Sequence, residues 1–348
     1  MKTLHLIVDP RRIEAPEAEA ALDRAAAILR VGGLVALPTE TVYGLGANAL
    51  DRAAVERIFK AKRRPAWDPI IVHISDEAML EGLVSQVPQA ARRLMEAFWP
   101  GPLTLLLPRR PAVPDVVTAG RALVGVRMPS HPVALELIRR AGVPVAAPSA
   151  NRFGHISPTT AAHVLDDLDG RIDAVLDAGP ATGGVESTVL DPSLTPMTIY
   201  RPGAVTAEQI REIAGPAEVY QGGETRKREA LPSPGLGMRH YAPRARLVLV
   251  EGPVDELGAR LAEAARTWEG DRLGVMLPTR VAAPHGIAVE CVYAWGRWDA
   301  PEELAQGLYA GLRALDATGC SVILCPLPAA DGLGAAIRDR LQKAGNRE

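Results

Sequence analysis

The spacing of apolar positions predicts alternating helices and strands over the first two thirds of the chain. Residues 16–31 repeat an apolar side chain every three or four positions, as a helix does, and the glycine pair at 32–33 ends it. A second helix is expected after Asp51, whose carboxylate can cap it, with Val55 and Ile58 on its buried face. Further helices are expected at residues 133–141 and 159–168, and strands at 34–37, 70–74, 103–107, 123–127, 143–147, 174–176, 188–190 and 197–200. This mixture predicts an α/β fold whose sheet has parallel and antiparallel neighbours.

The pattern changes at residues 216–243, which predict a linker between two domains. This stretch holds eight glycines and prolines and a charged run at 224–229. A smaller domain is expected at 244–348. Its predicted strands are 246–250, 273–277 and 321–324, and its predicted helices are 254–267, 301–317 and 333–343. Strands that alternate with helices in this way favour a small, mostly parallel sheet. The first domain accordingly spans residues 1–215.

Composition narrows the class of protein. Of the 348 residues, 47% are apolar and 23% charged, as in globular proteins, and the net charge of -2 gives no general attraction to nucleic acid. The three cysteines (Cys291, Cys320 and Cys325) are odd in number and form no pair of CxxC motifs, which disfavours a disulfide framework and a structural zinc site. We find no signal peptide and no stretch apolar enough to span a bilayer, so we expect no membrane partner and a cytoplasmic location.

A basic stretch lies beside a polar loop and suggests a site for a polyanion. Six of the thirteen residues 52–64 are basic, and Glu56 is the single acid among them. The loop 38–46 precedes this stretch, and a second polar loop at 148–151 would have to join it. No phosphate-loop motif is present in the sequence. The combination suggests an enzyme that handles a nucleoside triphosphate without the usual phosphate loop.

Each candidate side chain also has a purely structural interpretation. Thr39 and Thr41 can offer hydroxyls to a ligand or can cap a turn, and Gly44 and Gly46 can let the backbone turn and approach a ligand closely. His73 lies between apolar neighbours, where a histidine is more often part of the core. A buried Arg127 needs an anion, which is either an internal carboxylate or a ligand.

The second polar loop and three later residues complete the set. Ser149 and Asn151 offer a hydroxyl and an amide two positions apart, or they form a turn. Ser157, directly before Pro158, can be an ordinary helix cap. Ser187 and Arg201 are weak candidates when each is taken alone. Because such groups recur at strand ends, we expect them to converge on one edge of the sheet.

The chain closely resembles the threonylcarbamoyl-AMP synthase family in its long, two-domain form. The matching stretches, in order, are 38–46 (PTETVYGLG), 62–65 (KRRP), 69–73 (PIIVH), 99–104 (WPGPLT), 127–129 (RMP), 148–151 (PSAN), 186–189 (ESTV), 201–203 (RPG), 233–235 (SPG) and 240–243 (HYAP). The resemblance covers nearly the whole chain and implies a YrdC-like twisted mixed sheet with helices in the first domain.

The resemblance implies a reaction and a set of residues. L-threonine, bicarbonate or CO2, and ATP with Mg2+ would give threonylcarbamoyl-AMP and pyrophosphate for the modification of tRNA adenosine 37, by way of a downstream threonylcarbamoyl transferase complex. The family's signature falls on Lys62, Arg64, Ser149 and Asn151. The resemblance assigns catalysis to Lys62 and Arg64. It assigns ATP binding to Arg64, Ser149, Asn151, Ser157 and Arg201, and threonine binding to Thr39, His73, Arg127 and Ser187.

Two features of the resemblance add further expectations. Similar sequences usually have asparagine where this chain has Asp68, and an acid beside phosphates is repulsive unless a metal ion, Lys62 or Arg64 intervenes. The linker motif at 233–243, with one aromatic residue at Tyr241, suggests a lid over the loaded pocket.

Two other functions stay open. An RNA-binding module that uses the basic stretch 52–64 without catalysis is one, although residues 1–215 hold 23 Lys and Arg against 24 Asp and Glu, so any tRNA contact would be weak. The carbamoyl-transfer domain of hydrogenase maturation proteins is the other. That domain accompanies zinc-finger cysteines, and this chain has no cysteine before Cys291, which disfavours this alternative.

Overall fold

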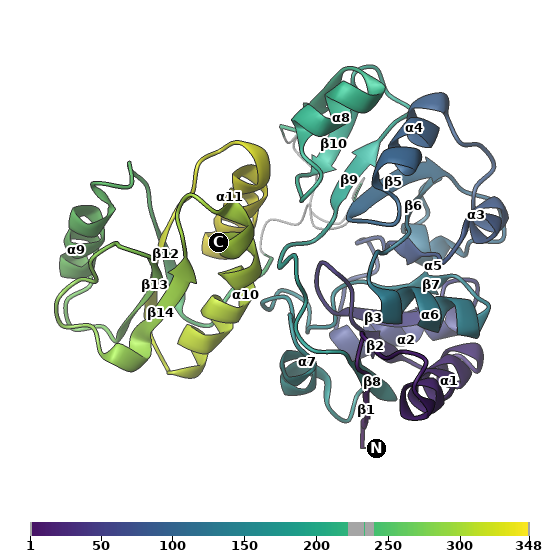
Figure 1. Cartoon of the computed structure of the whole chain (residues 1–348), viewed down its shortest axis with the longest axis horizontal. Helices are drawn as coiled ribbons and strands as arrows, with labels where there is room; N and C mark the ends of the chain where they lie inside the picture. Colours follow the sequence, from purple (N-terminus) through teal and green to yellow (C-terminus); the bar gives the residue numbers. More distant parts are fainter. Residues whose placement is uncertain (1, 222–232, 234–239, 347–348) are drawn as a thin grey trace. The chain divides into compact units, whose positions relative to one another are not determined.

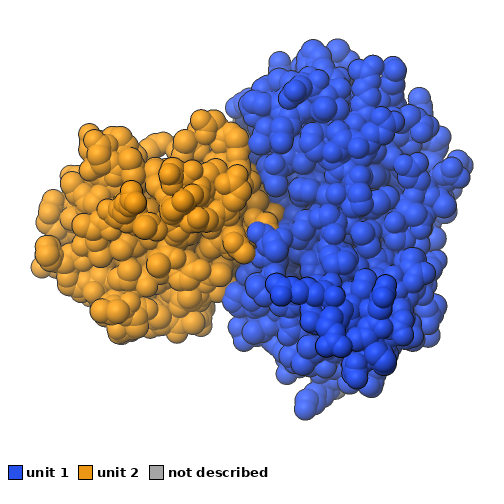
Figure 2. Space-filling view, viewed as in Figure 1, with its two compact units in different colours: residues 1–153, 158–182, 186–237 blue, residues 154–157, 183–185, 238–348 orange. Residues whose placement is uncertain are grey.

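The chain forms a mixed α/β structure with two separate sheets (Figure 1). It is a computed structural model that describes residues 2–221, 233 and 240–346. Figure 2 colours its two compact units: unit 1 contains residues 1–153, 158–182 and 186–237, and unit 2 contains residues 154–157, 183–185 and 238–348. Two short segments, residues 154–157 and 183–185, are thus grouped with unit 2. Both lie within the predicted first domain, residues 1–215.

Unit 1 is built on an eleven-stranded sheet. In the described residues its strand order is β1-β8-β2-β3-β7-β4-β6-β5-β9-β10-β11. The strands are β1 (Leu4–Ile7), β2 (Val35–Leu37), β3 (Gly44–Asn48), β4 (Val72–His73), β5 (Leu103–Pro108), β6 (Leu123–Arg127), β7 (Val145–Ala146), β8 (Ala174–Asp177), β9 (Thr188–Asp191), β10 (Met197–Arg201) and β11 (Ala217–Val219). Both parallel and antiparallel pairs occur, so the predicted mixed sheet is confirmed.

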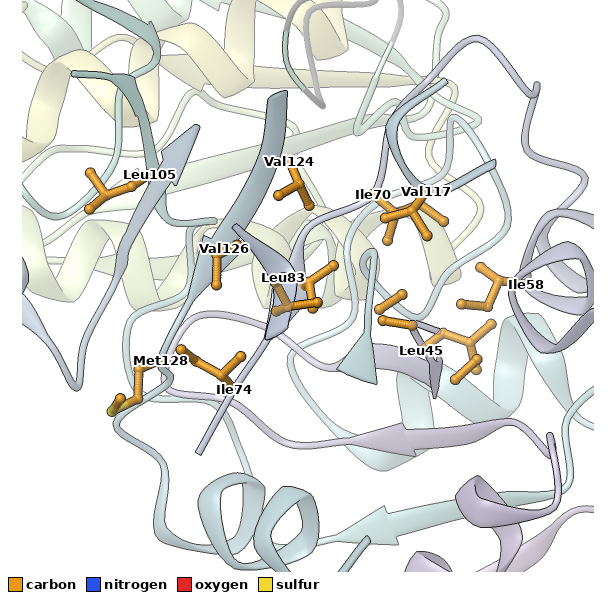
Figure 3. Packing of buried hydrophobic residues seen from close by; sticks show 14 of the residues in the cluster. Leu45, Ile58, Ile70, Ile74, Leu83, Leu105, Val117, Val124, Val126 and Met128 are labelled. Atoms are coloured by element: carbon orange, nitrogen blue, oxygen red, sulfur yellow. The ribbon is translucent and has the colours of Figure 1, made fainter. Parts of the chain in front are cut away.

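Helices cover both faces of this sheet. They are α1 (Pro16–Arg30), α2 (Arg52–Lys62), α3 (Glu77–Leu83), α4 (Gln89–Phe98), α5 (Asp115–Thr118), α6 (Pro132–Ala141), α7 (Ala161–Leu168) and α8 (Ala207–Ala214). Successive strand residues point to opposite faces. Val35 and Leu37 therefore pack in a cluster with α1 and α6, whereas Ala36 joins the larger core on the other face. Figure 3 shows part of that larger core around Leu45 and Val126.

The loop predicted at residues 38–46 is shorter than expected. Its last three residues begin β3, and neither Gly44 nor Gly46 has a positive φ. A Cβ on Gly46 would lie 2.8 Å from a methyl of Val145 and 2.9 Å from one of Leu37. These glycines therefore allow close packing within the sheet, and the expectation that they turn the backbone is wrong.

Other local predictions also change. The strand expected at 70–74 is only Val72–His73, and the strand expected at 143–147 is only Val145–Ala146. The helix expected from residue 159 begins at Ala161, and its N-cap is Thr160, which accepts a hydrogen bond from the N–H of His163. Ser157 is therefore not the cap of this helix.

Unit 2 contains the second sheet, with the strand order β12-β15-β13-β14 and parallel pairing throughout. Its elements are β12 (Arg246–Val250), α9 (Leu257–Thr267), β13 (Leu273–Pro278), the 3₁₀ turn η1 (Val289–Cys291), β14 (Val292–Gly296), α10 (Pro301–Ala317), β15 (Val322–Pro326) and α11 (Gly332–Gly345). The predicted small parallel sheet is confirmed, and β14 is a strand that the apolar pattern did not predict.

The predicted linker and lid fall largely outside the described residues. Of 216–243, residues 222–232 and 234–239 are not described, and β11 occupies the start of this stretch. Within the described part of the chain, no helix is long and apolar enough to cross a membrane.

Candidate active site

A cluster of polar side chains surrounds Arg127 at the end of β6. The guanidinium is 3% exposed, and its Nη2 donates to Oε2 of Glu40 over 2.9 Å. Its Nη1 donates to Oγ1 of Thr41 over 3.0 Å. Burial lowers the pKa of Arg127, and the negative charge of Glu40 opposes that shift. The anion that the sequence required for this arginine is thus present as an internal carboxylate.

Thr39 shapes the loop that carries Glu40. Its Oγ1 donates to the carbonyl of Val42 over 2.6 Å and accepts hydrogen bonds from the N–H groups of Thr41 and Val42, each over 3.2 Å. It also lies 2.8 Å from Oγ1 of Thr41. The hydroxyl therefore fixes the turn that presents the next two side chains to Arg127.

His73 lies beside Arg127, because β4 and β6 are parallel neighbours in which these two residues pair. It is buried, and burial followed by the charge of Arg127 lowers the pKa of His73 to about 3. The imidazole is therefore neutral near pH 7. Its Nδ1 is buried without a hydrogen-bond partner among the described residues.

Ser187 and Arg201 extend the cluster across β9 and β10. Nε and Nη2 of Arg201 donate to the carbonyl and to Oγ of Ser187, over 3.0 and 3.1 Å. Oγ of Ser187 also lies 2.8 Å from Oγ1 of Thr104 on β5. The charge of Arg201 contributes to the lowered pKa of Arg127, so the two guanidinium groups act on one region. We call Thr39, Glu40, Thr41, His73, Thr104, Arg127, Ser187 and Arg201 the Arg127 cluster.

A second cluster lies around Arg64, beyond the end of α2. Its Nη2 lies 2.9 Å from Oδ2 of Asp68 and donates to the carbonyl of Pro69 over 2.7 Å. Its Nε donates to the carbonyl of Asp68 over 3.2 Å. Both side chains are buried, and Asp68 is fully so. Arg64 thus compensates the acid at position 68.

Lys62 fastens the second polar loop to α2. Its Nζ donates to the carbonyls of Ser149 and Asn151, and the N–H of Phe153 donates to the carbonyl of Lys62. The side chain is 1% exposed. Burial, and then the neighbouring charge of Arg64, lower the pKa of Lys62 well below its usual range. We call Lys62, Arg64, Asp68, Ser149 and Asn151 the Arg64 cluster.

The strands β4 and β7, which lead to the two clusters, do not end at the same edge of the sheet. β7 is antiparallel to β4, with His73 opposite Val145 at the start of β7, whereas Ser149 follows the end of β7. The expectation that all polar strand ends converge is therefore wrong for these neighbours. The loop before β3 contacts both clusters, since Thr41 accepts from Arg127 and the carbonyl of Tyr43 accepts from the N–H of Ala150 over 2.8 Å.

Two predicted site residues belong to unit 2. Ser157 is buried, and its carbonyl accepts from Nε of Arg313 over 3.5 Å. Tyr241 is 4% exposed, with its ring centroid 5.6 Å from that of Tyr309 and the guanidinium of Arg340 5.6 Å from its centroid. Their assignments to ATP and to a lid stay predictions.

The structure adds Glu40 to the candidate residues. The sequence contained one signal for this residue. Arg127 was inferred to need an anion, and Glu40 is an acid of the first polar loop, between two threonines. For a metal ion, the described residues contain no group of three or more His, Cys, Asp or Glu side chains that could hold one.

Comparison with known proteins gives the family. A family model described as "Telomere recombination" matches residues 27–203, and one described as "Threonylcarbamoyl-AMP synthase, C-terminal domain" matches residues 205–346. A threonylcarbamoyl-AMP synthase from Pyrococcus abyssi is 44% identical over 322 residues, which is 92% of each chain. The chain belongs to the threonylcarbamoyl-AMP synthase family. It is therefore an enzyme of the nucleotidyltransferase class, as predicted.

Two further members of this family are similar over nearly the full length. The threonylcarbamoyl-AMP synthase of Bacillus subtilis is 44% identical over 345 residues, 99% of this chain and 98% of that protein. A crystal structure described as P. abyssi Sua5 complexed with L-threonine matches with a TM-score of 0.89 and 41% identity, over 99% of this chain and 98% of that one. The predicted two-part α/β fold agrees with this match.

Proposed function

We propose that the protein makes threonylcarbamoyl-AMP and pyrophosphate from L-threonine, bicarbonate or CO2, and ATP. We further propose that a tRNA threonylcarbamoyl transferase complex uses the product to modify adenosine 37. The Arg127 cluster carries this proposal, because it combines two guanidinium groups with hydroxyls in the family whose P. abyssi member has been crystallised with L-threonine. Guanidinium groups bind carboxylates well, and Arg127 and Ser187 are our choices for the carboxylate of threonine.

The proposed chemistry needs no covalent intermediate with the protein. The amine of threonine first adds to CO2 and loses protons, which gives a carbamate. A carbamate oxygen then attacks the α-phosphorus of ATP in line, and the bond to pyrophosphate breaks. The protein would contribute by positioning the reactants and by stabilising charge.

The Arg64 cluster supports the phosphate part of this proposal. Arg64 provides a guanidinium, and the loop of Ser149 and Asn151 is held close to it through Lys62. Mg2+ bound to ATP would neutralise charge on the phosphates, and proteins commonly bind this ion through one or two carboxylates together with substrate phosphates. Asp68, the carboxylate of this cluster, is already paired with Arg64, so we assign the ion to the phosphates and not to this side chain. Lys62 would then act mainly by holding the second loop.

Pyrophosphate release by the purified protein tests the proposal directly. With Mg-ATP, L-threonine and bicarbonate we expect release that stops when any one substrate is omitted. Arg64→Ala should lower that rate by about two or more orders of magnitude in a folded protein, as loss of a charge-stabilising group does.

Two results would count against the proposal. One is release that continues without threonine, which would indicate another acceptor. The other is no release from a folded sample, which would turn attention to the RNA-binding alternative.

A further inference from the structure

The ion pair between Arg127 and Glu40 is buried but only partly satisfied. Its side chains are 3% and 15% exposed. Nε of Arg127, a donor, and Oε1 of Glu40, an acceptor, are both buried without a hydrogen-bond partner among the described residues. Buried polar atoms are nearly always paired, so two open atoms in one ion pair indicate that something else completes it.

The two unsatisfied atoms have opposite hydrogen-bonding roles. Nε of Arg127 can donate to an anion, and Oε1 of Glu40 can accept from a cation or another donor. An α-amino acid at neutral pH carries both complements on one carbon atom, a carboxylate and an ammonium group. A ligand of this kind would satisfy both atoms without breaking the hydrogen bond between Nη2 of Arg127 and Oε2 of Glu40.

Three further side chains described near Glu40 supply no cation. His131 lies within reach of its charge, but burial lowers the pKa of His131, so that imidazole supplies no cation near pH 7. The neighbouring Thr39 and Thr41 are neutral, and the hydroxyl of Thr39 holds the turn. An ammonium group placed here would therefore meet a carboxylate whose described cationic partner is Arg127.

We propose that Glu40 binds the α-ammonium group of the amino-acid substrate through Oε1, while Arg127 binds its carboxylate. This assignment rests on the proposed function, in which that substrate is L-threonine. It gives the enzyme a means to select α-amino acids over hydroxy acids of the same shape. In the alternative, Glu40 only neutralises Arg127 and has no contact with substrate.

Ligand binding separates these two roles. The test compares L-threonine with (R)-3-hydroxybutanoate, which has the same carboxylate, hydroxyl and methyl groups but no ammonium. Dissociation constants can be measured by ligand-observed NMR titration without ATP, a method suited to weak affinities. We expect the wild-type protein to bind threonine about tenfold or more tightly than the analogue.

Glu40→Gln keeps the shape and an acceptor but removes the charge. We expect it to weaken threonine binding by about 10- to 100-fold, as loss of one charge-assisted hydrogen bond does, and to leave the analogue within about twofold. The preference for threonine should then largely disappear. Glu56→Gln, the same change in an exposed pair with Arg52, should keep both affinities.

The outcomes also distinguish this inference from the proposed function. If Glu40→Gln weakens both ligands equally, or leaves threonine binding unchanged, Glu40 does not contact the ammonium group. If the wild-type protein binds no threonine, the proposed function and this inference both fail. Should Glu40→Gln not fold, Glu40→Asp replaces it. That variant keeps the charge but shortens the side chain, so it should weaken threonine more than the analogue, and equal weakening would overturn the assignment.

Discussion

Two buried guanidinium groups of the candidate site, those of Arg64 and Arg127, are held in ion pairs that a ligand must complete or exchange. Arg64 is buried against Asp68, so its charge is already compensated before any phosphate arrives. An ATP phosphate would have to compete with this carboxylate for Arg64, and the negative charge of the carboxylate would repel the phosphate. A buried pair also matters for folding, because removing one partner leaves the other charge uncompensated.

Asp68→Asn should therefore change nucleotide affinity and stability in opposite directions. We expect Mg-ATP to bind about tenfold more tightly, because the carboxylate of Asp68 no longer competes with the phosphates for Arg64. We expect the free energy of unfolding to fall by about 1–3 kcal/mol, since the amide offers Arg64 a neutral acceptor instead of a charge. Calorimetric titration with a non-hydrolysable ATP analogue and urea unfolding measure the two quantities.

A matched substitution controls for net charge. Asp173→Asn removes the same charge from a more exposed pair with Arg57, at 22% and 43% exposure, and should leave ATP affinity unchanged. Weaker ATP binding by Asp68→Asn would show instead that the carboxylate itself helps to hold the nucleotide and its metal ion.

At the level of elements, the three consecutive basic residues at the end of α2 have three different roles. Lys62 is buried under the second loop, Arg64 is paired with Asp68, and Arg63 is the exposed C-cap residue with φ 55°. That φ lies in the left-handed region, which costs a residue with a side chain about 1–2 kcal/mol and suits glycine. The basic run is therefore not one uniform surface for a polyanion.

Arg63→Gly should raise the free energy of unfolding by about 1 kcal/mol and keep the rate of pyrophosphate release. Arg63→Ala is the matched control, because it removes the same charge but keeps the side chain that disfavours this backbone conformation. We expect a gain for glycine and none for alanine in parallel urea denaturation curves. Equal stability of the two variants, or a lost rate in both, would contradict this view of Arg63.

The elements also show how far the sequence could predict the structure. Apolar periodicity located α1, α6 and α10 well, because one face of each helix is buried in a continuous stripe. The two-residue strands β4 and β7 are too short for a period to define, and their antiparallel pairing depends on contacts distant in sequence. Local pattern could not supply that direction, so the predicted convergence of strand ends was wrong for β4 and β7.

The same limit applies to the candidate site. Residue type and position alone suggested that Arg127 is buried and needs an anion. They could not show that Glu40 supplies one oxygen to it and leaves the other open, because the sequence separation is 87 residues. Lys62 was assigned to catalysis from the resemblance. The hydrogen bonds that it donates to carbonyls of the second loop depend on the tertiary fold.

At the scale of the whole molecule, charge bears on the RNA-binding alternative. The chain has 39 Lys and Arg against 41 Asp and Glu, so its overall field does not attract nucleic acid. The basic stretch 52–64 offered the local exception. Within it, Arg52 pairs with Glu56, and Arg57 pairs with Asp173. Lys62 and Arg64 have buried partners, so four of the six cations already have partners within the chain, two of them in ion pairs at the surface.

We therefore expect weak, salt-sensitive binding of unmodified tRNA, with a dissociation constant above about 10 μM at 150 mM salt. Non-specific nucleic-acid binding that relies on few phosphate contacts falls in this range, and each contact adds to the slope of affinity against salt. Fluorescence anisotropy with labelled tRNA at 50 and 150 mM salt measures both quantities. Lys60→Glu together with Arg63→Glu should weaken the low-salt binding, because these side chains remain from the basic stretch once the four engaged cations are set aside. A dissociation constant below about 1 μM at 150 mM salt, unaffected by this double substitution, would mean that tRNA binds on a different surface and that the protein contacts it directly.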